Sequence, residues 1–129
     1  MRDSRTVLVC SSHSLTGAGM ARLLRGAGHR VPPLVDSPAS IAAAVDAEDP
    51  DVILIDSALL KDSVALVEGL RTSAAVAVLV GAEKSPRLRE ALLAGAKGFL
   101  SIDVSPGQFL ESINLLAEGA IVVSSEPGR

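Results

Sequence analysis

Apolar residues along this chain of 129 residues follow two alternating patterns, short β-branched runs and longer stretches with helical spacing. The short runs are typical of buried strands, and apolar residues three or four positions apart are typical of helices that bury one side. The expected strands are Thr6–Cys10, His29–Leu34, Val52–Asp56, Ala75–Val80 and Gly98–Ile102. The expected helices are Leu15–Arg25, Pro38–Glu48, Ser63–Arg71, Pro86–Ala94 and Pro106–Glu118.

Three of these helices begin with the dipeptide Ser-Pro, whose serines are Ser37, Ser85 and Ser105. Serine is a good N-cap, and proline is tolerated at the first helical position because its missing N–H has no helical partner there. Gln108 follows Ser105 at the spacing of a capping box, and Gly119 is well placed to end the last helix.

Five strand-then-helix units predict a parallel sheet with helices on both faces. We expect this domain to occupy residues 1–119 and residues 120–129 to begin a linker, because Ala120–Arg129 is a short β-prone piece followed by a polar Ser-Ser-Glu-Pro-Gly-Arg end. In such sheets, ligands and chemistry are found at the carboxyl ends of the strands.

Composition narrows the function classes. Twelve basic and fifteen acidic residues give a net charge of −3, whereas domains that hold nucleic acid on their own are usually basic. No apolar run approaches the ~20 residues that span a bilayer. The single cysteine, Cys10, excludes a disulfide framework and favours a reducing, cytoplasmic location.

Asp56 is the most conspicuous candidate for chemistry. It ends the apolar run "DVILID" at the point where a buried strand emerges into a loop. A carboxylate is costly to bury, so one at such a place is often functional. The simpler alternative is a solvated carboxylate at a strand end, hydrogen-bonded to loop N–H groups.

Three segments resemble the receiver domain of bacterial response regulators of the NarL/FixJ type. They are "VLVCSSHSL" at 7–15, "PDVILID" at 50–56 and "ALLAGAKGFLSIDVSPGQFLESI" at 91–113, and the resemblance covers almost the whole chain. It implies a flavodoxin-like fold with strand order 2-1-3-4-5, a phosphoacceptor position at Asp56 and a switch-aromatic position at Phe99.

The same resemblance identifies where the phosphorylation groups of the family would stand. The acidic pair that helps hold Mg²⁺ falls on Ser11 and Ser12, just before His13, which we do not expect to ligate a metal. The hydroxyl position falls on Gly81, next to Ala82, and the lysine position falls on Ile102. Phosphoryl transfer depends on positioning and on charge stabilisation, much of it supplied by the metal. We therefore expect no catalytic residue, metal or cofactor here, and a domain that works without phosphorylation.

The last expected helix carries an apolar stripe of Phe109, Ile113 and Leu116, to which Leu110 adds. One such stripe must cover the sheet, and any excess is a candidate homodimer face, although core packing alone explains each residue. The sequence thus predicts the regulatory part of a transcriptional regulator that acts through dimerisation and reaches DNA through an output domain outside these 129 residues.

Two other interpretations remain open. The less charged cleft around Ser11, Ser12, Gly81, Ala82 and Ile102 is a candidate pocket for a small molecule that would control the dimer. In the second interpretation, the domain is still phosphorylated on Asp56. The promoter, the ligand, the kinase and the helices of a dimer are not readable from the sequence.

Overall fold

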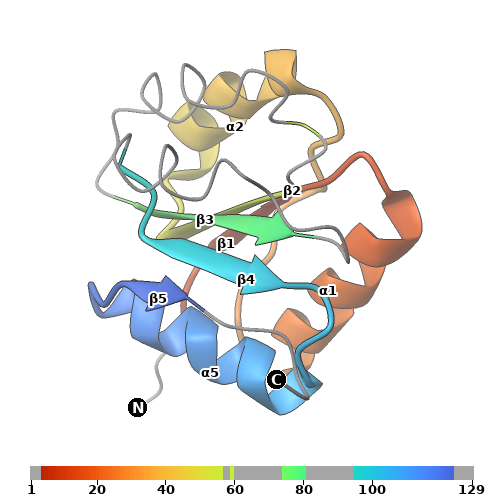
Figure 1. The fold of residues 1–129 in the computed structure, drawn as a ribbon. Helices are drawn as coiled ribbons and strands as arrows, with labels where there is room; N and C mark the ends of the chain where they lie inside the picture. Colours follow the sequence, from red (N-terminus) through yellow and green to blue (C-terminus); the bar gives the residue numbers. More distant parts are fainter. Residues whose placement is uncertain (1–3, 57–58, 60–73, 81–94, 124–129) are drawn as a thin grey trace.

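The protein forms a parallel β-sheet packed between helices (Figure 1). The computed structural model describes residues 4–56, 59, 74–80 and 95–123. Within these ranges the sheet has five strands, β1 (Val7–Cys10), β2 (Val52–Asp56), β3 (Ala75–Val80), β4 (Gly98–Ser101) and β5 (Val122–Val123). The predicted α/β class with a parallel sheet is confirmed.

Helices lie on both faces of the sheet (Figure 1). Helix α1 (Ser14–Gly26) and helix α5 (Pro106–Ala117) cover one face. The short 3-10 turn η1 (Pro38–Ser40) and helix α2 (Ile41–Glu48) cover the other. The expected helices at 63–71 and 86–94 lie outside the described residues.

Alternate residues of each strand point to opposite faces, as the two-residue period of a strand requires. On β2, Val52 and Leu54 pack beneath α1 and α5, whereas Ile53 and Ile55 pack beneath α2. All four side chains are fully buried. The continuous apolar runs of the sequence therefore reflect a sheet that is buried on both faces.

The predicted order 2-1-3-4-5 is not matched in full, because the sheet order is β1-β2-β3-β4-β5. Strands β1 to β4 are the expected first, third, fourth and fifth strands in the predicted sequence, whereas the expected second strand is missing from the sheet and β5 is added. The expected second strand, residues 29–34, forms no ladder. Its segment lies beside β1 and touches it through two isolated parallel bridges, Thr6↔Arg30 and Cys10↔Val35. Pro32 and Pro33 fall between these bridges, and proline has no N–H to donate to a ladder.

The opposite edge of the sheet holds a short strand within the segment that the sequence indicated as β-prone. Val122 and Val123 pair in parallel with Gly98 and Phe99 of β4. The Val122 N–H also donates to the Lys97 carbonyl at 2.8 Å. The sheet therefore includes Val122 and Val123.

Helix α5 begins and ends as the sequence predicts. The Ser105 hydroxyl accepts the Gln108 N–H at 3.2 Å, and the Gln108 side chain accepts the Ser105 N–H at 3.4 Å. This is the predicted capping box. At the other end, Gly119 has a φ of 99°, a backbone conformation that glycine adopts without strain.

Candidate functional site

Asp56 lies at the carboxyl edge of the sheet, opposite the loop that follows β1. Strands β1 and β2 pair in register, with Cys10 opposite Ile55. The next residue of each strand is Ser11 on one side and Asp56 on the other. The pairing of two buried strands therefore brings a hydroxyl and a carboxylate together at this edge.

Two side chains of the β1–α1 loop hold the Asp56 carboxylate. The Ser11 hydroxyl donates to Asp56 Oδ2 at 3.0 Å. His13 Nδ1 lies 3.0 Å from the same oxygen. The Asp56 side chain is 17% exposed and the His13 side chain 63% exposed, so the imidazole shields the carboxylate from solvent.

Ser11 is also the organising residue of the loop. Its side chain is buried, and its Oγ accepts the His13 N–H at 3.0 Å. The same Oγ lies 3.2 Å from the His13 carbonyl oxygen, but its one proton cannot serve both that carbonyl and Asp56 fully. These bonds fix the backbone of His13, the N-cap position directly before α1 begins at Ser14.

This group does not have the geometry of a hydrolytic triad. In such a triad the imidazole lies between the hydroxyl and the carboxylate and accepts the hydroxyl proton. Here the hydroxyl and the imidazole both contact the carboxylate oxygen. The arrangement stabilises Asp56 and does not activate Ser11 as a nucleophile.

The sequence identified Asp56 and Ser11 but missed the role of His13. The contact depends on the turn that His13 makes two residues after Ser11, and a turn of this kind has no strong sequence signal. The sequence nevertheless contained a signal, because His13 lies only two positions after Ser11, the residue beside the strand-end carboxylate of Asp56.

The other residues expected at the cleft are dispersed. Ser12 is exposed and Ile102 is 50% exposed. Gly81 and Ala82 lie outside the described residues. Phe99 is buried and packs in the core on the α2 side of the sheet.

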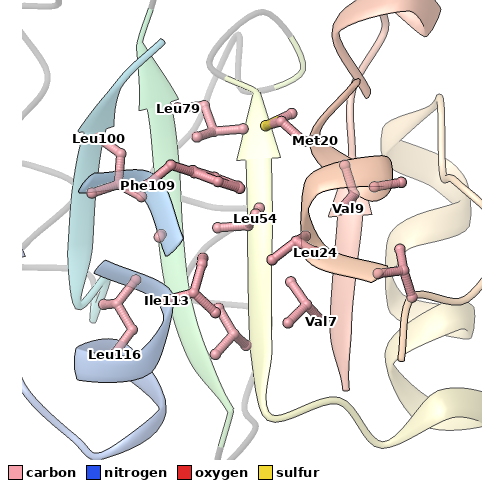
Figure 2. Packing of buried hydrophobic residues seen from close by; sticks show 14 of the residues in the cluster. Val7, Val9, Met20, Leu24, Leu54, Leu79, Leu100, Phe109, Ile113 and Leu116 are labelled. Atoms are coloured by element: carbon pink, nitrogen blue, oxygen red, sulfur yellow. The ribbon is translucent and has the colours of Figure 1, made fainter. Parts of the chain in front are cut away.

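A cavity of about 240 Å³ opens near this edge, between α1 and α5. Its floor is formed by Met20, Leu79 and Phe109, which are buried. Figure 2 shows these three side chains, from α1, β3 and α5, near the carboxyl ends of the strands. Ile102 was one of the residues expected to line the small-molecule pocket beside Asp56. In the structure it lines this cavity between α1 and α5.

The apolar stripe of α5 is used by the core. Phe109, Ile113 and Leu116 are all buried against the sheet (Figure 2). Leu110 is partly buried against the same cluster. These four residues were the expected dimer face, and their burial leaves Leu115, which is 40% exposed, as the large apolar side chain that α5 presents to solvent.

Two further titratable groups are buried but do not form a metal site. Burial raises the pKa of the Cys10 thiol to about 12. Burial, with the charge of Arg5 as a second cause, lowers the pKa of His29. Among the described residues no group of three His, Cys, Asp or Glu side chains is arranged to hold a metal ion.

In the same described ranges of the chain, no helix combines the length and the hydropathy needed to cross a bilayer.

The chain is an α/β domain with a parallel sheet between helices and an acidic residue at the carboxyl edge of that sheet. Solved structures with a similar fold are receiver domains. The signal receiver domain of the response regulator NarL from Mycobacterium tuberculosis is 26% identical, and the match spans 92% of this chain and 99% of that one with a TM-score of 0.80. A two-component response regulator of the LuxR family from Aurantimonas is 18% identical over 97% of this chain and 91% of that one, with a TM-score of 0.83.

A CheY-like receiver domain protein from Methanospirillum hungatei is 19% identical and spans 90% of this chain and 95% of that one, with a TM-score of 0.79. No family model and no curated protein matches the sequence. The structural neighbours of this chain are therefore receiver domains of response regulators.

Proposed function

We propose that this chain is a receiver domain that works without phosphorylation and regulates transcription through dimerisation. The observation that carries the proposal is the pair of contacts from Ser11 and His13 to Asp56 Oδ2. A phosphoryl group on that oxygen would have to displace both side chains. The contacts thus stabilise the unmodified carboxylate.

The donor set around Asp56 also fits Mg²⁺ poorly. Mg²⁺ prefers octahedral oxygen ligands and is usually held through one or two carboxylates together with waters. The described neighbours of Asp56 Oδ2 are a hydroxyl and an imidazole, and neither adds negative charge to offset the dehydration of the ion. The described residues at this site therefore do not fit Mg²⁺.

Ile102 argues in the same direction. The resemblance to receivers implies a lysine at this position, whose ammonium would contact a phosphoryl oxygen. A modification shifts a conformational equilibrium only through contacts that differ between the two states. An isoleucine side chain offers a phosphoryl group no such contact.

The surface of α1 and α5 supports a homodimer. These helices lie on the same face of the sheet (Figure 1). The charged residues of α1 are Arg22 and Arg25, whereas α5 carries Glu111, followed by Glu118 at its C-cap. In the described chain, neither Arg22 nor Glu111 belongs to an ion pair.

A two-fold axis between two copies would place α1 of one against α5 of the other. Opposite charges would then face each other twice, because an isologous interface repeats each contact. Leu23 and Leu115, both partly exposed, supply apolar surface beside these charges. We assign the dimer face to these two helices.

The remaining parts of the proposal follow from the receiver class. Receiver domains usually act with output domains, and here residues 120–129 would lead toward a helix-turn-helix domain. Dimerisation would then place two such domains at the spacing of paired half-sites. This assignment also implies a cytoplasmic protein.

Sedimentation velocity over a concentration series tests the proposal. We expect a monomer–dimer equilibrium that acetyl phosphate with Mg²⁺ does not shift, and that the Asp56→Asn variant retains. Arg22→Glu and Glu111→Lys should each weaken the dimer about tenfold, and the double variant should recover it, because the swap restores opposite charges. A monomer at every concentration, or a dimer that requires acetyl phosphate, would contradict the proposal.

A further inference from the structure

We infer that the cavity between α1 and α5 is a binding site for a compact, uncharged, apolar small molecule. The Asp56 cleft is a separate place on the same edge of the sheet, and the inference does not depend on whether Asp56 is phosphorylated. It goes beyond the proposed function because it adds a ligand to a face that the dimer would use.

The cavity has a closed floor and an open mouth. Met20, Leu79 and Phe109 are buried and form the floor. Thr16, Leu23 and Ile102 also line the cavity and are exposed, so they form the mouth. A small molecule can therefore enter from solvent and be covered on its inner side by core side chains.

The lining determines the charge of the ligand. None of the described residues that line the cavity is charged. Thr16 and Ser101 contribute hydroxyl groups, and the Ser101 hydroxyl already accepts the Asp103 N–H at 3.0 Å. A charged ligand would lose its hydration without a partner, whereas an apolar ligand with at most one or two polar atoms would not.

The volume determines the size of the ligand. Engineered apolar cavities of about 150 Å³ bind benzene, and drug-sized pockets begin near 300 Å³. At about 240 Å³ this cavity suits a ligand of about six to ten non-hydrogen atoms. Water in such a cavity would make few hydrogen bonds and would be displaced readily.

Three features suit the cavity to small ligands. The thioether side chain of Met20 is unbranched and polarisable, so it adapts to ligands of slightly different shape. The ring of Phe109 offers a face or an edge for an aromatic ligand. Isoleucine at position 102 keeps the mouth apolar, where the lysine that the resemblance implies would introduce a charge.

Binding is tested with toluene as the probe and benzoate as the charged molecule of matched shape. The readout is the NMR signal of the Met20 methyl group in the complete 129-residue chain, together with the thermal unfolding midpoint. We expect toluene to shift the Met20 signal saturably and to raise the midpoint, and benzoate to do neither at the same concentration.

Thr16→Leu fills the mouth from an exposed helical position, and Ala18→Leu makes a similar change on the same helix at an exposed residue outside the cavity lining. We expect toluene affinity to fall at least tenfold in Thr16→Leu and to be unchanged in Ala18→Leu. Leu23→Phe narrows the mouth from α1 in the same way and replaces Thr16→Leu should that variant fail to fold.

Absence of a saturable shift up to the solubility of toluene would overturn the inference. Equal affinity in Thr16→Leu and in the unchanged protein, or equal binding of benzoate, would overturn it as well. The proposed dimer would use the same face, so these readouts are made at a concentration at which the chain is monomeric. They do not involve acetyl phosphate, so failure of this inference is distinguishable from failure of the proposed function.

Discussion

Two places on the carboxyl edge of the same sheet differ completely in chemistry. At the ends of β1 and β2, a carboxylate is held by a hydroxyl and an imidazole. Near the ends of β3 and β4, an apolar cavity opens between α1 and α5. Both places are made by loops that leave parallel strands at one edge, where ligands of such folds usually bind.

The difference shows that the position in the fold does not determine the chemistry. The resemblance implies a phosphoacceptor position at Asp56, and in the structure Ser11 and His13 contact the carboxylate of this residue. The resemblance implies a lysine at position 102, and in the structure Ile102 lines the apolar cavity. One place is therefore polar and the other apolar, although both lie at the same edge of the sheet.

The largest expected effect concerns the floor of the cavity. Phe109→Ala removes a buried ring from the core between α5 and the sheet and enlarges the cavity. We expect the free energy of unfolding, measured with urea, to fall by about 3 to 5 kcal/mol. Phe109→Leu should cost about 1 to 2 kcal/mol, because it removes fewer buried carbons.

Asn114→Ala is the matched control for this pair, because Asn114 is exposed on the same helix. Its free energy of unfolding should stay within about 0.5 kcal/mol of the unchanged protein. A loss of under about 1 kcal/mol in Phe109→Ala would show that the ring is not part of the core at this end of the sheet.

A smaller loss of stability is expected at the polar site formed by Ser11, His13 and Asp56. Ser11→Ala removes a buried hydroxyl that donates to Asp56 and accepts the His13 N–H. We expect a loss of about 1 to 2 kcal/mol in the free energy of unfolding, because buried polar groups lose their partners. Ser12→Ala, at the exposed neighbour, should change it by less than about 0.5 kcal/mol.

Equal effects of Ser11→Ala and Ser12→Ala would mean that the Ser11 contacts add nothing to stability. The contrast between the two places would then rest on Asp56 and His13 alone. Urea unfolding of the two variants, measured side by side, decides this point.

The smallest expected effect is a pH dependence of the free energy of unfolding that comes from His29, outside the Asp56 site. Burial lowers the pKa of His29, and its Nδ1 accepts the Arg5 N–H at 3.1 Å, so the folded protein favours the neutral ring. The unfolded chain binds a proton at a higher pH than the folded one. Stability should therefore be constant above about pH 6.5 and fall as the pH is lowered below it.

The His29→Asn variant keeps an acceptor for the Arg5 N–H but does not titrate. Its free energy of unfolding should fall less than that of the unchanged protein between about pH 7.5 and pH 5.5. An identical slope in both proteins would show that His29 is not the responsible group.

The fold was readable from the sequence to the extent that it depends on local pattern. The run Val52–Asp56 and the run Ala75–Val80 form strands with the predicted ends, because each contains a continuous run of apolar residues. The segment 29–34 looked similar but contains two prolines, which remove the N–H groups that a ladder needs. The tail beginning at Ala120 was predicted to be β-prone, but the pairing of Val122 with Gly98 could not be read from so short a piece.

The site was predictable only in part. Asp56 and Ser11 follow from strand ends, and their closeness follows from the register of two predicted strands. The contact with His13 depends on the conformation of one loop, and the cavity depends on the angle between two helices. Neither is encoded in the spacing of residues along the chain.

Intact-mass measurement after incubation with acetyl phosphate and Mg²⁺ tests the central claim most directly, with Asp56→Asn as the control. We expect the mass of the unchanged protein to stay the same, because the contacts of Ser11 and His13 with Asp56 Oδ2 stabilise the unmodified carboxylate. An adduct with the mass of one phosphoryl group, present in the unchanged protein and missing in Asp56→Asn, would contradict it.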